Sequence, residues 1–191
     1  MQSRMRPRAR TVVALAALAA GSGACAGRTH HPAGPPTTAA NWTVIPGVKM
    51  VKAESEADCG AAALSMVLGR WSPDLDDRAI ARALGPPDSI NGYRAAMLRN
   101  VARSQGMNAF VIEGQVTDLL HEVSLGRPVI VGVMTTRLGR AYPHYQVVAG
   151  ADTAGEWFLI ADPRGTWTRV PAQELLTGWR PAGQVAVVVF P

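Results

Sequence analysis

Residues 58–70 of the 191-residue chain read DCGAAALSMVLGR. Alanine, leucine, methionine and valine dominate this stretch, and an apolar run of helix formers that ends near a glycine predicts a buried helix. Cys59 stands at the expected start of this helix, where unsatisfied backbone N–H groups and the helix dipole stabilise a thiolate. Gly60 follows, and its lack of a side chain lets a substrate carbonyl approach the backbone closely. We therefore expect a helix that presents a reactive cysteine.

The rest of the chain divides into a helical first half and a strand-rich second half. Further helices are predicted at residues 73–84, 93–104 and 117–123, with a short strand at 109–112. β-Branched and apolar runs punctuated by Gly and Pro predict strands at 128–134, 144–149, 157–161, 167–170 and 184–190, interrupted by a helix at 172–177. Helices followed by strands predict an α+β fold, with the N-terminal helices packed on a largely antiparallel sheet.

Two later residues complete a set that supports nucleophilic catalysis. A cysteine nucleophile needs a base, and the base needs a group that orients it. His144 opens a predicted strand, and Asp162 ends the following one. If these strands are neighbours, both side chains project from the same end of the sheet. His144 can then face Cys59, and Asp162 can hold the imidazole tautomer. The Cys59 backbone N–H is the expected oxyanion donor.

Each of these residues taken alone has a simpler structural explanation. A lone cysteine in an apolar helix is usually a buried small hydrophobe. A histidine before a strand is often a loop residue, and an Asp-Pro pair is often a turn. Their order along the chain favours a catalytic set over three unrelated structural residues.

The same residues resemble the motifs of one enzyme family. Residues 58–68 resemble the nucleophile helix of the C39 cysteine peptidases, papain-like bacteriocin-processing enzymes whose pattern is D-C-G-x-A-x-L-x-M. HYQVV at residues 144–148 resembles the family's histidine strand, and the Asp-Pro pair that begins 18 residues after His144 resembles its third member. The resemblance spans residues 44–190, and residues 175–179 and the hydrophobic last strand match the family's usual ending.

This resemblance implies a papain-like fold with Cys59 as nucleophile, His144 as general base and then acid, and Asp162 as the residue that orients the imidazole. Many family members cut leader peptides after a double glycine and are fused to an ABC transporter. The sequence has no Walker motif and no membrane domain, so it resembles the stand-alone, exported branch of the family. The implied partners are a peptide substrate and a separate ABC transporter, and no metal or other cofactor is implied.

One position departs from the family pattern. The family usually places a glutamine five or six residues before the cysteine, where its amide donates to the oxyanion. Ala53 and Glu54 stand at those positions; an alanine donates nothing, and a glutamate repels the developing charge. Losing one such donor typically costs about 10²–10³ in kcat. Gln146 shares a strand face with His144 by alternation and is a distant substitute at best.

Several other side chains have a possible role at a peptide-binding cleft. Trp157, Trp167 and Trp179 could line a peptide groove, although tryptophan in a small core is more common. Arg137 and Arg140 flank the loop before the histidine strand and could face an acidic peptide, although a plain surface loop is the simpler explanation. We therefore expect core tryptophans and surface arginines.

The N-terminus has the features of an export signal. Four arginines and no acid occupy the first ten residues, and nine of the next ten, at 11–20, are apolar. Ser-Gly-Ala-Cys at 22–25 resembles a bacterial lipobox, although leucine is usual at its first position. We favour a lipid on Cys25, which predicts an exported, membrane-anchored lipoprotein of the bacterial envelope. The alternative is an A-x-A cut before Gly27, which predicts a secreted or periplasmic soluble protein.

The composition fits this division of the chain. We expect a signal peptide at residues 1–24, a Pro- and Gly-rich tether at 25–43 and a peptidase domain at 44–191. The formal net charge is +5, but four of the 19 basic residues precede Cys25, which leaves 15 basic against 14 acidic residues. The charge therefore gives no support for nucleic-acid binding. The two cysteines exclude a disulfide-rich scaffold and an all-cysteine zinc site.

Three hypotheses follow from the sequence. The leading one is an exported, lipid-tethered cysteine peptidase that cleaves a peptide substrate in the cell envelope. The alternative is a catalytically impaired C39-like domain that binds peptides without cutting them, because the usual glutamine is missing. The third is an envelope lipoprotein in which Cys59 is merely buried, and it requires His144 and Asp162 to lie far from Cys59.

Overall fold

The computed structural model describes residues 29–31, 41–152 and 154–191. The predicted signal peptide, Cys25 and most of the predicted tether lie outside these residues. Two short strands fall at least partly within the predicted tether, β1 (Thr29–His31) and β2 (Trp42–Val44). Both add to the main sheet, so these residues differ from the flexible segment that the composition led us to expect.

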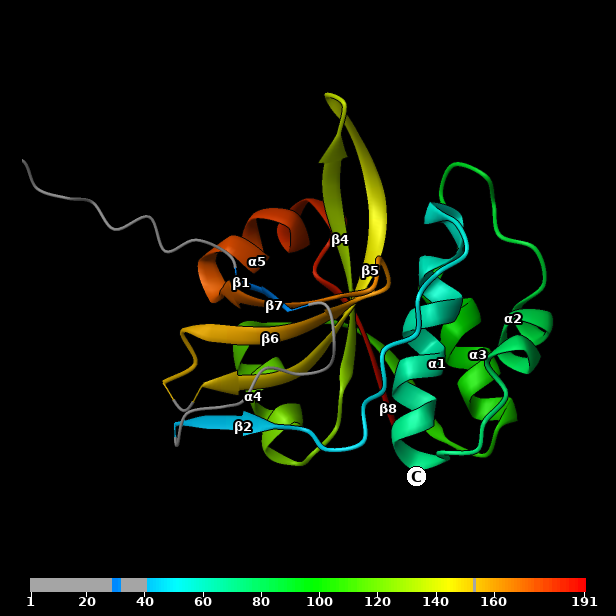
Figure 1. Cartoon of the computed structure of the whole chain (residues 1–191), viewed down its shortest axis with the longest axis horizontal. Coiled ribbons are helices and arrows are strands. Elements are labelled where there is room, and N and C mark those ends of the chain that lie inside the picture. Colours follow the sequence, from blue (N-terminus) through cyan, green and yellow to red (C-terminus); the bar gives the residue numbers. More distant parts are fainter. Residues whose placement is uncertain (1–28, 32–40, 153) are drawn as a thin grey trace, which may run out of the picture.

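The first half of the domain is helical, as the sequence predicts. A short 3-10 turn, η1 (Glu56–Asp58), leads directly into α1 (Cys59–Trp71), and α2 (Asp77–Leu84) and α3 (Ala95–Ser104) follow. The first ten residues of α1 are all buried. Figure 1 shows why, because α1 lies between the sheet on one side and α2 and α3 on the other.

The second half supplies the sheet. Its strands are β3 (Asn108–Glu113), β4 (Val129–Arg137), β5 (Arg140–Asp152), β6 (Trp157–Asp162), β7 (Thr166–Pro171) and β8 (Val185–Phe190). The described strands run in the order β1-β7-β6-β5-β4-β8-β3, with β2 paired to β5, and every pair is antiparallel. The predicted α+β class with an antiparallel sheet is therefore confirmed.

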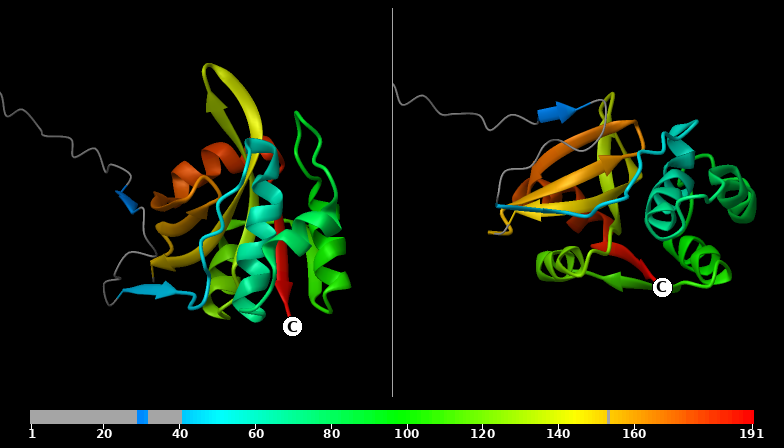
Figure 2. Two further views of the ribbon diagram at one scale, coloured as in Figure 1. Left: turned by 45° about the vertical axis from the view of Figure 1, so that its right-hand side comes forward. Right: turned by 60° about the horizontal axis from the view of Figure 1, so that its bottom comes forward.

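Three further elements complete the domain. These are α4 (Val116–Ser124), α5 (Ala172–Trp179) and the 3-10 turn η2 (Arg180–Ala182). Helices α4 and α5 both pack on β4, α4 also on β5 and α5 also on β7. Figure 2 shows α1, α2 and α3 grouped on one side of the molecule, separate from α5. Residues 52–56, just before α1, line a recess together with residues of the β4–β5 hairpin and the β6–β7 turn.

The β4–β5 hairpin extends beyond the rest of the sheet and passes beside the start of α1 (Figure 1). Its last pair is Arg137 opposite Arg140, and the two residues between them, Leu138 and Gly139, have φ of 49° and 75°. Positive φ at both central residues is the geometry of a type I′ turn, whose twist suits a two-residue hairpin. The register of this hairpin fixes which side chains of β5 face Cys59.

The core joins α1 and the sheet with the inner faces of the other helices. Trp167, Trp179 and Phe158 are among its largest fully buried side chains, so the first two are core residues and do not line a groove. Trp157 is half-buried at the start of β6. Within the described part of the chain, no helix combines the length and apolar character that a membrane crossing requires.

Candidate active site

Cys59 is the first residue of α1 and is buried, with 4% of its surface exposed. It lines a recess formed by η1, the loop before α3 and the β4–β5 hairpin. Asp58 occupies the N-cap position, but its side chain makes no capping hydrogen bond to the helix. Its carboxylate instead accepts from Ser55 Oγ at 2.6 Å. The helix end that carries the thiol therefore has no capping hydrogen bond from the side chain at its N-cap position.

A backbone donor on β5 contacts the sulfur. The Tyr145 N–H donates to Cys59 Sγ at 3.4 Å, and the Tyr145 hydroxyl donates to the Tyr93 carbonyl oxygen at 3.0 Å. The phenol thus holds this part of β5 against the helical half of the molecule. The hydrogen bond to Cys59 Sγ therefore ties the first residue of α1 to β5. This contact was not predicted from the sequence, because it depends on the register of β5 against α1.

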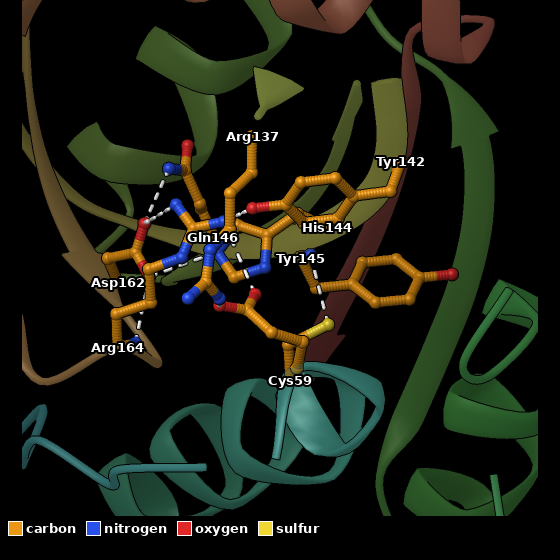
Figure 3. Close-up of polar contacts among 9 residues, drawn as sticks. Cys59, Arg137, Tyr142, His144, Tyr145, Gln146, Asp162 and Arg164 are labelled. Atoms are coloured by element: carbon orange, nitrogen blue, oxygen red, sulfur yellow. Dashed lines mark hydrogen bonds and ion pairs between the residues drawn. The ribbon is translucent and has the colours of Figure 1, made fainter. Parts of the chain in front are cut away.

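His144 and Asp162 lie together, as the strand argument predicts. His144 Nε2 and Asp162 Oδ1 are 2.9 Å apart, and both side chains are almost fully buried. Among the described residues, no atom forms a hydrogen bond with His144 Nδ1. Figure 3 shows the imidazole lying between the Asp162 carboxylate and the Cys59 side chain. Asp162 therefore binds one ring nitrogen and leaves the other for chemistry at the cysteine.

The electrostatics of this group favour an imidazolium. Burial alone lowers the pKa of His144, but the hydrogen bond to Asp162 and the nearby Cys59 thiol outweigh it and raise the pKa to about 9. Burial raises the pKa of Asp162, but the hydrogen bond and charge of His144, with smaller contributions from Arg164 and Gln146, hold it below its usual value. At neutral pH the pair is therefore a buried carboxylate and an imidazolium.

Asp162 has further partners that fix its position. Gln146 Nε2 donates to Asp162 Oδ2 at 2.8 Å, and the Arg164 backbone N–H donates to Oδ1 at 2.8 Å. The Arg164 guanidinium also pairs with Oδ2 at 3.8 Å. Gln146 does share the face of β5 that carries His144, as alternation predicts, but its amide is used on the Asp162 side. The amide nitrogen of Gln146 is therefore engaged with the carboxylate that orients His144.

The two positions that lack the usual glutamine lie at the cleft. Ala53 and Glu54 line a recess of about 590 Å³ that His144 also lines. The Ala53 backbone N–H donates to the Pro163 carbonyl oxygen at 2.8 Å, which ties this segment to the residue after Asp162. A longer side chain at position 53 thus has a route into the recess, where alanine supplies no donor.

Gly60 has a packing role that the sequence argument did not identify. A Cβ at this position would lie 3.0 Å from the Tyr93 ring and 3.2 Å from the Tyr145 ring. Close approach of two aromatic side chains therefore requires a residue without a side chain here, and the approach of a substrate carbonyl stays a prediction.

An ionic cluster beside the catalytic group was also missed. Glu56 Oε1 pairs with Arg137 Nη1 at 3.3 Å, and its Oε2 pairs with Arg164 Nη2 at 3.3 Å. Arg164 also donates to the Tyr142 hydroxyl at 2.5 Å. These residues come from η1, the hairpin and the β6–β7 turn, so no local pattern joins them. Among the described residues, no group of three or more His, Cys, Asp or Glu side chains could hold a metal ion.

Solved structures similar to this one are C39-type peptidases. A C39-like peptidase from Bacillus anthracis has 18% identity and a TM-score of 0.63, covering 78% of this chain and 98% of its own. The peptidase domain of Streptococcus ComA, a bi-functional ABC transporter involved in quorum sensing, has 23% identity and a TM-score of 0.62, covering 75% and 98%. A double glycine motif protease from an AMS/PCAT transporter, solved with its leader peptide, has 20% identity and a TM-score of 0.58, covering 78% and 98%.

Sequence comparison agrees with these structural matches. A lactococcin transport/processing ATP-binding protein, LcnC-like, from Lactococcus lactis subsp. lactis (strain IL1403) is 26% identical over 124 residues, which are 65% of this chain and 16% of that protein. The chain therefore spans about a sixth of the length of this relative. The sequence pattern of the Peptidase C39 family matches residues 47–189. The chain belongs to the peptidase C39 family.

Proposed function

We propose that this C39 family member is a cysteine peptidase in which Cys59 attacks the scissile carbonyl of a peptide. One observation carries the proposal. His144 lies between a buried carboxylate, 2.9 Å from its Nε2, and Cys59, whose sulfur accepts a hydrogen bond from the next residue of the same strand. This arrangement supplies a nucleophile, a base and a group that orients the base. It also argues against a site-less envelope protein, which requires these residues to lie apart.

The first half of the reaction uses a thiolate and an imidazolium. We assign the thiol proton of the reacting form to His144, whose pKa of about 9 keeps the ring charged at neutral pH. The thiolate attacks the carbonyl carbon, a C–S bond forms, and the carbonyl electron pair moves to oxygen. We assign the Cys59 backbone N–H as a donor to that oxyanion. When the intermediate collapses, the C–N bond breaks and His144 gives its proton to the leaving amine.

The second half returns the enzyme to its starting state. A water molecule attacks the thioester carbonyl while neutral His144 accepts a proton from it. The C–S bond breaks, the acid product leaves, and the thiolate–imidazolium pair is restored. Asp162 keeps its charge throughout and holds the ring through Nε2, so that Nδ1 always faces the sulfur.

The proposal extends to the substrate and the cellular setting. We assign a peptide with a double-glycine leader as substrate, because one structural neighbour is a double glycine motif protease. We also propose a separate ABC transporter as partner, because ComA and the LcnC-like relative are transport proteins. The lipid on Cys25 and the bacterial envelope location rest on the N-terminal sequence alone, and intact-mass measurement of the mature protein tests them.

The alternative is a C39 domain that binds peptides without efficient cleavage. The specific observation in its favour is that Ala53 and Glu54, the two positions where the family pattern can have an amide donor, both line the recess beside His144. Under this alternative the catalytic group is intact, but the oxyanion lacks one hydrogen-bond donor. The loss of that donor lowers kcat by about 10²–10³. Turnover by the natural protein at an ordinary enzymatic rate would eliminate it.

Digestion of a peptide library tests the proposal. We expect the full chain to release products detectable by mass spectrometry, and we expect Cys59→Ala to release none. Cys25→Ser is the matched control, because it removes the other cysteine of the chain and should leave cleavage unchanged. Products that persist in Cys59→Ala, or an inactive wild type, would overturn the peptidase assignment.

A further inference from the structure

Two recesses meet at the catalytic group and share a wall. One has a volume of about 590 Å³ and is lined by His144; the other has a volume of about 410 Å³ and is lined by Cys59. Glu56, Arg137 and Tyr142 line both. A peptide that contacts Cys59 and His144 together must therefore cross the place where the Glu56 carboxylate meets Arg137.

The wall is a carboxylate held between two guanidinium groups. Glu56 accepts from Arg137 at 3.3 Å through one oxygen and from Arg164 at 3.3 Å through the other. These side chains are substantially exposed, from 37% for Arg164 to 64% for Arg137. Exposed pairs of this kind are weak, so they open readily. The planar guanidinium group is well matched to a carboxylate.

The two arginines differ in what they retain when Glu56 moves away. Arg164 keeps Asp162, with which its Nη1 pairs at 3.8 Å, and the Tyr142 hydroxyl. Within the described residues, Arg137 has Glu56 as its ionic partner and no other. The neighbouring Lys52 and Glu54 also line the His144 recess and balance one another in charge. Arg137 is therefore left as an unpaired cation beside Cys59.

We propose that Arg137 and Arg164 form a subsite for a carboxylate of the peptide substrate, and that Glu56 fills this subsite while the cleft is empty. The proposal rests on the peptidase function above and adds a substrate class, namely peptides with a carboxylate near the scissile bond. Glu56 is three residues before Cys59 and already places a carboxylate at the required position. A substrate carboxylate restores both ionic contacts as Glu56 leaves, whereas a neutral substrate leaves the two guanidinium groups less well paired.

Alkylation of Cys59 tests the subsite without requiring turnover. Iodoacetate and iodoacetamide are nearly isosteric and differ in charge. The full chain is alkylated with each reagent and then digested with trypsin. The rate constant for Cys59 is read from the peptide that spans residues 53–70, and the two rate constants are compared as a ratio. We expect Glu56→Gln to raise the iodoacetate/iodoacetamide ratio about threefold or more, and Arg137→Gln to lower it by a similar factor. The iodoacetamide rate itself shows that Cys59 is still native and accessible.

Arg140→Gln is the matched control. Arg140 carries the same charge, lies opposite Arg137 in the hairpin and lines the Cys59 recess. We expect it to change the ratio by less than twofold. If Arg140→Gln lowers the ratio as much as Arg137→Gln does, the overall positive charge around the recess attracts iodoacetate, and no specific subsite is needed. That result would overturn the proposal. Unchanged ratios in both Glu56→Gln and Arg137→Gln would do so as well.

Peptide substrates identify the source of the carboxylate. Paired peptides that carry Glu or Gln near the scissile bond test an acidic side chain, and paired peptides with free or amidated C-termini test a terminal carboxylate. In one of the two pairs, we expect the peptide with the carboxylate to have a kcat/KM about tenfold higher than its neutral partner. We expect this difference to shrink in Arg137→Gln. Equal rates within both pairs would contradict the proposal. If the alkylation ratio changes in Glu56→Gln and Arg137→Gln but no peptide is cleaved, the anion subsite stands. The peptidase function is then refuted.

Discussion

The Gln146 side-chain amide donates to Asp162 Oδ2 at 2.8 Å, on the opposite side of the carboxylate group from the His144 contact. A buried carboxylate needs several donors, because each unsatisfied lone pair costs free energy. Gln146 supplies one of them from the strand face that also carries His144. This glutamine therefore acts as a positioning residue for the carboxylate.

Removing this amide should weaken catalysis and shift its pH dependence. A hydrogen bond to a charged group contributes roughly 1.5–3 kcal/mol, so we expect Gln146→Ala to lower kcat about tenfold with little change in KM. Gln146 lowers the pKa of Asp162, so the acid limb of the kcat/KM profile should move to higher pH. Gln184→Ala is the control, because it removes an amide bond to the Gly114 carbonyl oxygen. An unshifted profile in Gln146→Ala would contradict this role.

Stability should fall in alkaline solution because of His144. Its folded pKa of about 9 lies above the unfolded value of 6.5, so the charged ring stabilises the fold below pH 6.5. This contribution is lost as pH rises from 6.5 to about 9. Urea denaturation at pH 6 and pH 9 should show a loss of roughly 2–3 kcal/mol in the free energy of unfolding.

The matched variant for this pH effect is Asp162→Asn. Asp162 is a main cause of the raised pKa of His144, whereas burial lowers it. In the variant the burial effect should prevail, and the alkaline loss of stability should shrink or reverse. Equal losses in the variant and the wild type would show that the ion pair does not govern this part of the pH profile.

A side-chain amide at position 53 should increase turnover. Ala53 lines the recess beside His144, and an oxyanion donor of this kind is worth about 10²–10³ in kcat. We expect Ala53→Gln to recover part of this, a rise of about tenfold or more. Glu54→Gln adds an amide at the other candidate position and removes a repelling carboxylate, so it should also gain. Glu113→Gln is the control, because it adds an amide at the exposed end of β3, outside this recess, and should leave turnover unchanged. No gain in either Ala53→Gln or Glu54→Gln would mean that the missing glutamine is not what limits the enzyme.

The helices and strands were largely predictable because their signals are local. The apolar run at 58–70 predicts a buried helix, and the structure has α1 at Cys59–Trp71. The β-branched runs predict the strands to within a few residues at each end, with β5 extended by its hairpin with β4. Strand β1 was missed because three residues in a Pro- and Gly-rich segment have no periodic pattern of their own.

The site was predictable only where chain order and strand alternation were informative. His144 and Asp162 meet because β5 and β6 are neighbours, which the sequence suggested. The Glu56 cluster was not predictable, since its partners are 81 and 108 residues away in the chain. Contacts of this kind depend on how the hairpin packs against α1, and no local pattern encodes that packing.

Two glycines of α1 should respond oppositely to alanine. A Cβ at Gly60 would lie 3.0 Å from the Tyr93 ring, whereas no described atom outside the helix lies within 4 Å of a Cβ at Gly69. We expect Gly60→Ala to lower the free energy of unfolding by about 1–3 kcal/mol through overpacking. Gly69→Ala should raise it by up to about 1 kcal/mol through helix propensity. Urea denaturation measures both, and a shift in the same direction would contradict the packing argument.

Trapping the acyl-enzyme tests the central claim, that Cys59 is the nucleophile, most directly. A peptide that the protein cleaves is mixed with it, quenched in acid during turnover and digested, and the 53–70 peptide is analysed by mass spectrometry. The account predicts an acyl adduct on Cys59 that hydroxylamine removes and that His144→Ala fails to accumulate. Cleavage that proceeds with no adduct on Cys59, and equally fast in Cys59→Ala, would contradict it.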